Sequence, residues 1–64
     1  MSIIKCECGA EILLVPQVEL MGSAIEAHAA EHEGKELNPA RAKAAAKRIR
    51  ELLIKQVLSK AIDR

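Results

Sequence analysis

The sequence predicts a small α+β domain in which a β-hairpin is followed by a helix and then by a second, longer helix. Two β-prone runs, residues 3–6 and 10–15, flank Cys6-Glu7-Cys8-Gly9, a segment with the composition of a tight turn. Gly9 can adopt the positive φ that such a turn often requires. Beyond residue 17 the apolar side chains recur at helical spacing. The chain has 64 residues, which is room for one domain only.

The composition leaves this domain with a weak core. The chain contains no Phe, Trp or Tyr, and its apolar half consists of smaller side chains such as Ala, Ile, Leu and Val. A fold of this length buries only about 60% of its unfolded surface and is marginally stable. We therefore expect a metal ion, a disulfide or a partner chain to stabilise the structure.

The first helix is expected over residues 17–33. Its apolar stripe follows the i, i+3, i+4 rule and comprises Val18, Met21, Ile25, His28, Ala29 and His32. Gly22 weakens this helix, so a start at Ser23 as N-cap is an alternative. Gly34 is placed as the C′ residue that ends the helix.

The second helix is signalled by Asn38 as N-cap and Pro39 as the first helical residue. No Gly or Pro follows, and the helix should run to about Asp63, a length of roughly 36 Å. We therefore divide the chain into a hairpin–helix module, residues 1–35, and a long, basic, amphipathic C-terminal helix, residues 36–64.

Four side chains have the composition of a metal site. Cys6 and Cys8 lie at the predicted turn, and His28 and His32 are one helical turn apart on the inward stripe. Two thiolates and two imidazoles form a closed tetrahedral set that balances the charge of one structural zinc ion. Sulfur and imidazole favour zinc over magnesium or calcium. Unliganded cysteines, a redox pair and another metal are the alternatives.

Cysteines in a hairpin turn followed by a helix with H-x-x-x-H resemble the two-Cys, two-His zinc finger, over residues 3–34. The resemblance implies a small α+β metal-stabilised domain, a ββα finger followed by a long C-terminal helix, with Cys6, Cys8, His28 and His32 as ligands. The chain departs from the family in its C-x-C spacing and in the 19 residues between Cys8 and His28, where the family has about 12. A zinc-ribbon or treble-clef-like arrangement is a related alternative.

The same histidines also match H-x-x-E-H, the signature of inverted zinc peptidases, with Glu31 as the general base. A peptidase needs an open coordination position and a substrate cleft. Binding by both cysteines leaves no open position, and a chain this small has little material for a cleft. We therefore expect no enzymatic activity and no small-molecule substrate, and we interpret Glu31 as a solvated helix residue.

The charges are divided along the chain. Residues 1–38 carry two basic and seven acidic side chains, and residues 39–64 carry eight basic and two acidic ones. An acidic first helix argues against a standard DNA base reader. The candidate phosphate-binding residues lie in the second helix and are Arg41, Lys43, Lys47, Arg48 and Arg50. A solvated helix face is the competing interpretation, and no aromatic residue is present to stack on a base.

The C-terminal helix carries apolar residues over most of its circumference at 100° per residue. One small finger cannot cover such a surface, so we expect a second copy or a protein partner. The candidate interface residues are Leu52, Leu53, Ile54, Val57, Leu58, Ala61 and Ile62. The alternative is a helix folded back on the apolar face of the hairpin, at Ile12 and Leu14.

The sequence shows no membrane or secretory signal. The longest apolar run, Ile12 to Val15, is far shorter than the roughly 20 residues that span a bilayer. We expect a cytoplasmic, non-catalytic zinc-binding interaction module that self-associates or docks on a protein partner. The alternative is a small regulatory zinc-finger protein that binds nucleic acid through the basic helix.

Overall fold

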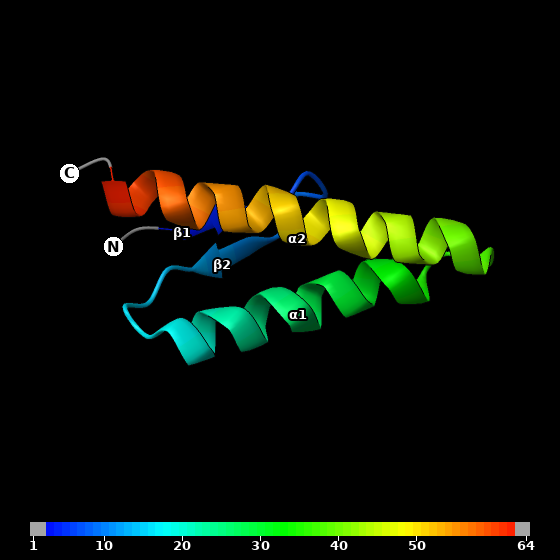
Figure 1. The fold of residues 1–64 in the computed structure, drawn as a ribbon, viewed down its shortest axis with the longest axis horizontal. Helices are drawn as coiled ribbons and strands as arrows, with labels where there is room; N and C mark the ends of the chain where they lie inside the picture. The colour runs from blue at the N-terminus through cyan, green and yellow to red at the C-terminus, as the bar shows by residue number, and fades with distance from the viewer. Residues whose placement is uncertain (1–2, 63–64) are drawn as a thin grey trace.

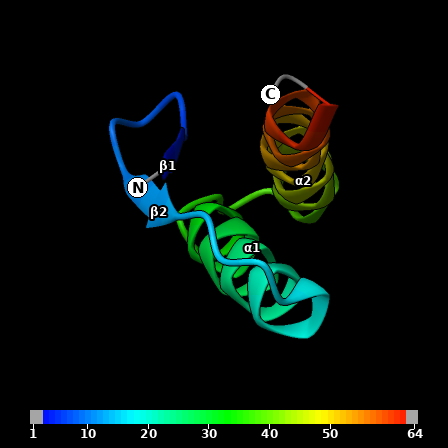
Figure 2. The ribbon, with the colours of Figure 1, turned by 90° about the vertical axis from the view of Figure 1, so that its left-hand side faces the viewer.

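The chain forms a two-stranded hairpin and two helices, which a computed structural model describes for residues 3–62 (Figure 1). The elements are β1 (Ile3–Lys5), β2 (Glu11–Leu13), α1 (Val18–Gly34) and α2 (Pro39–Ile62). The helices run antiparallel along an elongated body of 40 × 18 × 17 Å. Seen along the helices, the hairpin, α1 and α2 occupy three corners around a shared interior (Figure 2).

The hairpin confirms the predicted turn. β1 and β2 are antiparallel, with Ile4 opposite Ile12. The N–H of Gly9 donates to the carbonyl of Cys6 at 3.0 Å, and the N–H of Cys6 donates to the carbonyl of Ala10 at 2.9 Å. Gly9 has φ +95°, which a residue with a Cβ rarely adopts. The turn therefore depends on glycine at this position.

The first helix differs from its prediction at both ends. It begins at Val18 after an extended Gln17 that makes no side-chain cap, so Gly22 lies inside the helix and the alternative start at Ser23 is wrong. Gly34 is the last helical residue and not a left-handed C′ residue. The helix instead ends in tight turns, in which the N–H of Lys35 donates to the carbonyl of His32 at 3.3 Å. These bonds satisfy the terminal carbonyls without a left-handed residue.

The second helix begins as predicted. The side-chain oxygen of Asn38 accepts hydrogen bonds from the backbone N–H groups of Ala40 at 2.9 Å and Arg41 at 3.2 Å. Pro39 is the first helical residue, where its missing N–H costs nothing. The predicted end near Asp63 falls outside the described residues.

All the main elements contribute to one hydrophobic core. Its fully buried large side chains are Ile4 from β1 and Ile49 and Leu53 from α2. α1 contributes Met21 and Ile25, which are each about 5% exposed. The inner face of α2 is thus covered by the chain itself, and Leu53 cannot belong to a surface for another protein. This corrects its assignment as an interface residue.

An unforeseen contact holds α2 against the hairpin. The N–H of Lys5 donates to Oε1 of Gln56 at 2.8 Å, and Nε2 of Gln56 donates to the carbonyl of Lys5. One side-chain amide therefore satisfies both backbone groups of Lys5 at the outer edge of β1. Edge strands expose such groups to pairing with other chains, but here the side chain of Gln56 in the same chain already forms hydrogen bonds with them.

Candidate metal centre

The structure brings the four predicted ligands together. Sγ of Cys6 lies 3.4 Å from Nε2 of His32, and Sγ of Cys8 lies 3.4 Å from Nε2 of His28. The two Nε2 atoms are 3.2 Å apart, and all four ligand atoms lie within 4.8 Å of one another. A tetrahedral zinc ion with ordinary bond lengths requires S–N separations of about 3.6 Å and N–N separations of about 3.3 Å. The four atoms are therefore arranged to bind a metal ion, consistent with zinc.

Two local structures position these ligands. The turn closed by Gly9 presents both cysteines on the same side, with Cys6 buried and Cys8 exposed. Helical spacing places His28 and His32 one turn apart on α1, with ring centroids separated by 4.8 Å. A metal ion here would cross-link the hairpin to the C-terminal half of α1, more than 19 residues further along the chain.

Glu31 is exposed, as its interpretation as a solvated helix residue predicts, but it also contacts the site. Its Oε2 lies 3.0 Å from Nδ1 of His28, although the carboxylate is exposed. This contact leaves Nε2 of His28 free for the metal, which is the usual role of a carboxylate behind a ligating histidine. The three-residue spacing from His28 was the available sequence signal, since i, i+3 residues are neighbours on a helix.

The two thiols differ in their tendency to ionise. A hydrogen bond with the backbone of Ala10 is the main reason that the pKa of Cys8 falls from 9.0 to about 6. Desolvation is the next largest effect and opposes this shift, and hydrogen bonds with Cys6, His28 and His32 lower the pKa further. Burial raises the pKa of Cys6. Because zinc binds thiolates, Cys8 is the cysteine better prepared to accept the ion.

The turn between the cysteines also contacts α2. Arg48 Nη2 lies 3.1 Å from the carboxylate of Glu7, and Arg50 Nε lies 2.8 Å from the carboxylate of Glu26 on α1. Both arginines were candidate phosphate-binding residues, and both are paired within the chain. These ion pairs are partly exposed, so each contributes little to stability. They do set the direction of the two arginine side chains.

The five basic candidates do not lie on one face of α2. Arg41, Lys43 and Lys47 are exposed and make no ion pair with any residue in the described part of the chain. At about 100° per residue, Arg41 shares a flank of α2 with Arg48. Lys43 and Arg50 lie about 160° away from this flank, and Lys47 lies about 100–120° away from it. The five cations therefore form two groups and not one continuous strip.

The predicted interface residues are also distributed around α2. Leu52 and Val57 are half-buried, whereas Ile54 and Leu58 are 46% and 58% exposed. The side chains of Ala61 and Ile62 lie outside the described residues. The exposed part of the predicted interface thus centres on Ile54 and Leu58.

No protein-family model, curated protein or solved structure matches the chain. Its resemblance to two-Cys, two-His zinc fingers rests on the four ligand side chains. Within residues 3–62, neither helix is both long and apolar enough to cross a membrane. The cytoplasmic location stays a prediction.

Proposed function

We propose that the chain is a non-catalytic zinc-binding module, similar to a two-Cys, two-His finger, that presents α1 and α2 to a protein partner. The observation that carries the proposal is the convergence of two thiols and two Nε2 atoms from the turn and α1. One zinc ion per chain would complete this set. The module would act by holding a surface in place, not by transforming a substrate.

The need for zinc follows from the size of the core. Three large side chains are fully buried, and none of them is aromatic. A core of a domain this small rarely contributes more than about 3–5 kcal/mol, whereas structural zinc contributes on the order of 10 kcal/mol in small fingers. Zinc binding is therefore expected to decide whether the hairpin and α1 stay together.

The ligand geometry supports a structural role over a peptidase role. Two thiolates and two imidazoles fill a tetrahedral site, and a hydrolytic zinc ion needs an open position for water. Glu31 would be the general base of the H-x-x-E-H pattern, but its carboxylate contacts Nδ1 of His28, on the side of the ring away from the metal-binding Nε2. In this position Glu31 orients a ligand.

Metal analysis of the purified chain tests the proposal. We expect about one zinc per chain, with cobalt substitution giving the absorption of a tetrahedral sulfur–nitrogen site. Cys8→Ser should lose most of the metal and unfold, and Ser59→Ala, on the exposed side of α2, should retain both metal and fold. A chain whose free energy of unfolding is the same with and without zinc, or a Cys8→Ser variant with full metal content, would contradict the proposal.

Nucleic-acid binding is the competing function. One observation favours it: three basic side chains of α2 are exposed and form no ion pair within the described chain, namely Arg41, Lys43 and Lys47. Binding through these side chains would be non-specific and would weaken steeply with salt. Titration with labelled duplex DNA and RNA at low salt tests it. A Lys43→Glu, Lys47→Glu variant should lose the binding, and the absence of binding by the native chain would eliminate this function.

A further inference from the structure

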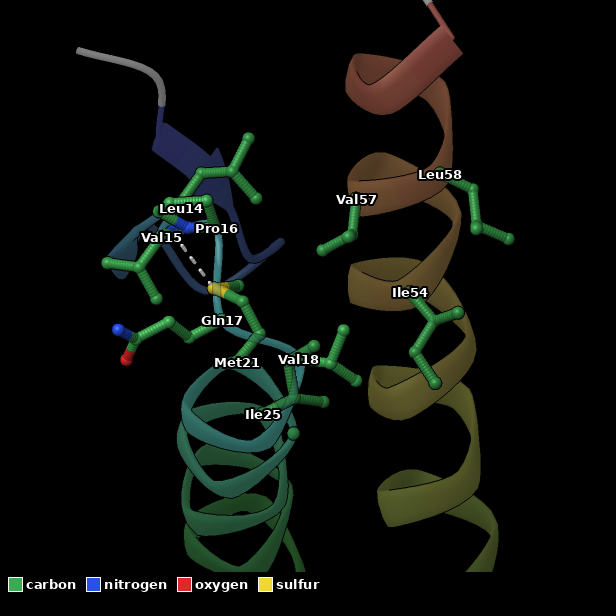
Figure 3. Close-up of a pocket in the computed structure, with 11 residues that line it drawn as sticks. Leu14, Val15, Pro16, Gln17, Val18, Met21, Ile25, Ile54, Val57 and Leu58 are labelled. Carbon is green, nitrogen blue, oxygen red and sulfur yellow. Dashed lines mark hydrogen bonds between the residues drawn. The ribbon is translucent and has the colours of Figure 1, made fainter.

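An apolar groove opens between the helices at the end of the molecule away from their connection (Figure 3). It encloses about 740 Å³, and the segment 14–17 forms one of its walls. The residues that line its helical walls are Val18, Met21, Gly22 and Ile25 from α1, and Ile54, Val57 and Leu58 from α2. Val57 points toward α1, whereas Leu58 is directed outward from α2 (Figure 3). The apolar surface therefore continues from the groove onto the outside of α2.

This surface is incompletely covered by the chain. Val18 is 88% exposed, Leu58 58% and Ile54 46%. Exposed apolar side chains are ordinary when they are isolated, but these three all line one groove. An exposed apolar groove of this kind is typical of a surface that contacts another protein.

The chain exposes more surface than a compact monomer of its mass is expected to expose. A compact monomer of 7.0 kDa is expected to expose about 4,000 Å², and this chain exposes 4899 Å². The excess of about 900 Å² is close to the roughly 800 Å² that each partner buries in a protein–protein interface of standard size. The elongated shape of the chain, 40 × 18 × 17 Å, contributes to this excess, which leaves room for a contact of standard size.

The charges of the helices favour a second copy as the partner. α1 carries four acidic side chains and no Lys or Arg, whereas α2 carries seven basic side chains and one acidic one. Within one chain only the Glu26–Arg50 pair joins α1 to α2 among the described residues. The basic α2 of a second copy would thus lie against the acidic α1 beside the apolar groove. Electrostatic complementarity of this kind favours one partner and one orientation.

We propose that two copies associate symmetrically, with the Ile54–Leu58 side of each α2 packed against α1 and the groove of the other copy. This inference rests on the proposed function as an interaction module and names its partner. Both copies contribute the same surface, so each contact occurs twice, as in the isologous interface of a two-fold dimer. Four helices then enclose the apolar groove residues that one copy leaves open.

The mass of the zinc-loaded chain in solution tests the proposal. Sedimentation equilibrium over a wide concentration range should give a dimer of twice 7.0 kDa. Leu58→Glu should raise the dissociation constant at least about tenfold, because a central apolar contact is lost. The matched control is Leu37→Glu in the connector, where the side chain is 99% exposed and lies outside the groove. This control should dimerise as the native chain does.

The orientation has its own test at Val18. Val18→Lys adds a positive charge where the basic α2 of the other copy is expected, so it should weaken the dimer several-fold more than Val18→Glu. The reverse order would overturn the packing of α1 against α2. Zinc content and helical circular dichroism, measured on every variant, show whether it has folded.

The outcomes separate this inference from the proposed function. A native chain that binds one zinc and remains monomeric at all concentrations would overturn the dimer and leave the zinc module intact. A native chain without zinc would overturn the module itself. Equal dissociation constants for Leu58→Glu and Leu37→Glu would place any dimer on another surface and would also contradict the inference.

Discussion

The contact between Glu31 and His28 leads to a prediction that the sequence alone did not suggest. Replacing Glu31 by alanine removes the carboxylate that lies 3.0 Å from Nδ1 of His28. The imidazole then loses the partner that orients its ring with Nε2 toward the other ligand atoms. The exposed helix itself should tolerate the change, because alanine has the highest helix propensity.

The expected loss of zinc affinity follows from the position of Glu31, which contacts one of the four ligands but is not itself a ligand. Removal of such a partner costs about 10- to 100-fold in metal affinity, which corresponds to about 1.4–2.7 kcal/mol. The effect should lie toward the lower end of this range, because the carboxylate is 69% exposed and water can replace part of its contact. Glu31→Gln should lose less than Glu31→Ala, because its amide oxygen can still accept a hydrogen bond from Nδ1.

Zinc affinity is measured by competition with a chromophoric chelator at neutral pH. Glu33→Ala is the matched control, since it removes an equal charge from the same part of α1 at an exposed residue with no hydrogen bond to a ligand. The reasoning is refuted if Glu31→Ala binds zinc within about twofold of the native chain. An equal loss in Glu33→Ala would show that net charge, and not orientation of His28, determines the affinity.

Three further predictions follow from the core, the edge of β1 and the turn. Leu53→Ala should destabilise the zinc-loaded chain by about 2–5 kcal/mol in chemical unfolding, because Leu53 is fully buried, whereas Leu37→Ala should have little effect. Gln56→Ala should cost about 1–3 kcal/mol and accelerate exchange of the Lys5 amide proton, since both bonds at that residue are lost; unchanged exchange would exclude the contact in solution. In the metal-free chain, alkylation of Cys8 should slow as the pH falls through about 6. Ionisation of Cys8 should stabilise the fold fully above pH 9, by a decreasing amount between pH 9 and about 6, and not at all below about 6. An alkylation rate with its midpoint near pH 9 would contradict the lowered pKa.

Local sequence patterns were sufficient for the elements whose ends depend on near neighbours. The cap at Asn38 and the turn at Gly9 were predicted correctly because each depends on hydrogen bonds within a few residues. The ends of α1 were predicted less well. Gly22 was tolerated inside the helix, because tertiary packing of Met21 and Ile25 outweighs a propensity cost of about 1 kcal/mol.

The apolar circumference of α2 shows the limit of the same approach. Helical periodicity reveals how wide an apolar surface is, but not which sector another element covers. Leu53 and Ile54 are neighbours in sequence, and both were assigned to an interface. In the structure Leu53 is fully buried and Ile54 is 46% exposed, because α1 and β1 cover only the inner sector.

The sequence by itself determined the ligand types, their spacing on a turn and a helix, and the order of the hairpin and two helices. These features depend on residue chemistry and on the periodicity of the backbone. Only the tertiary structure decided that Glu31 supports His28, that Gln56 occupies the edge of β1, and that Arg48 and Arg50 are directed toward acidic partners. Each of these is a contact whose existence depends on side-chain direction or on how separate elements pack in space, and linear spacing does not specify either.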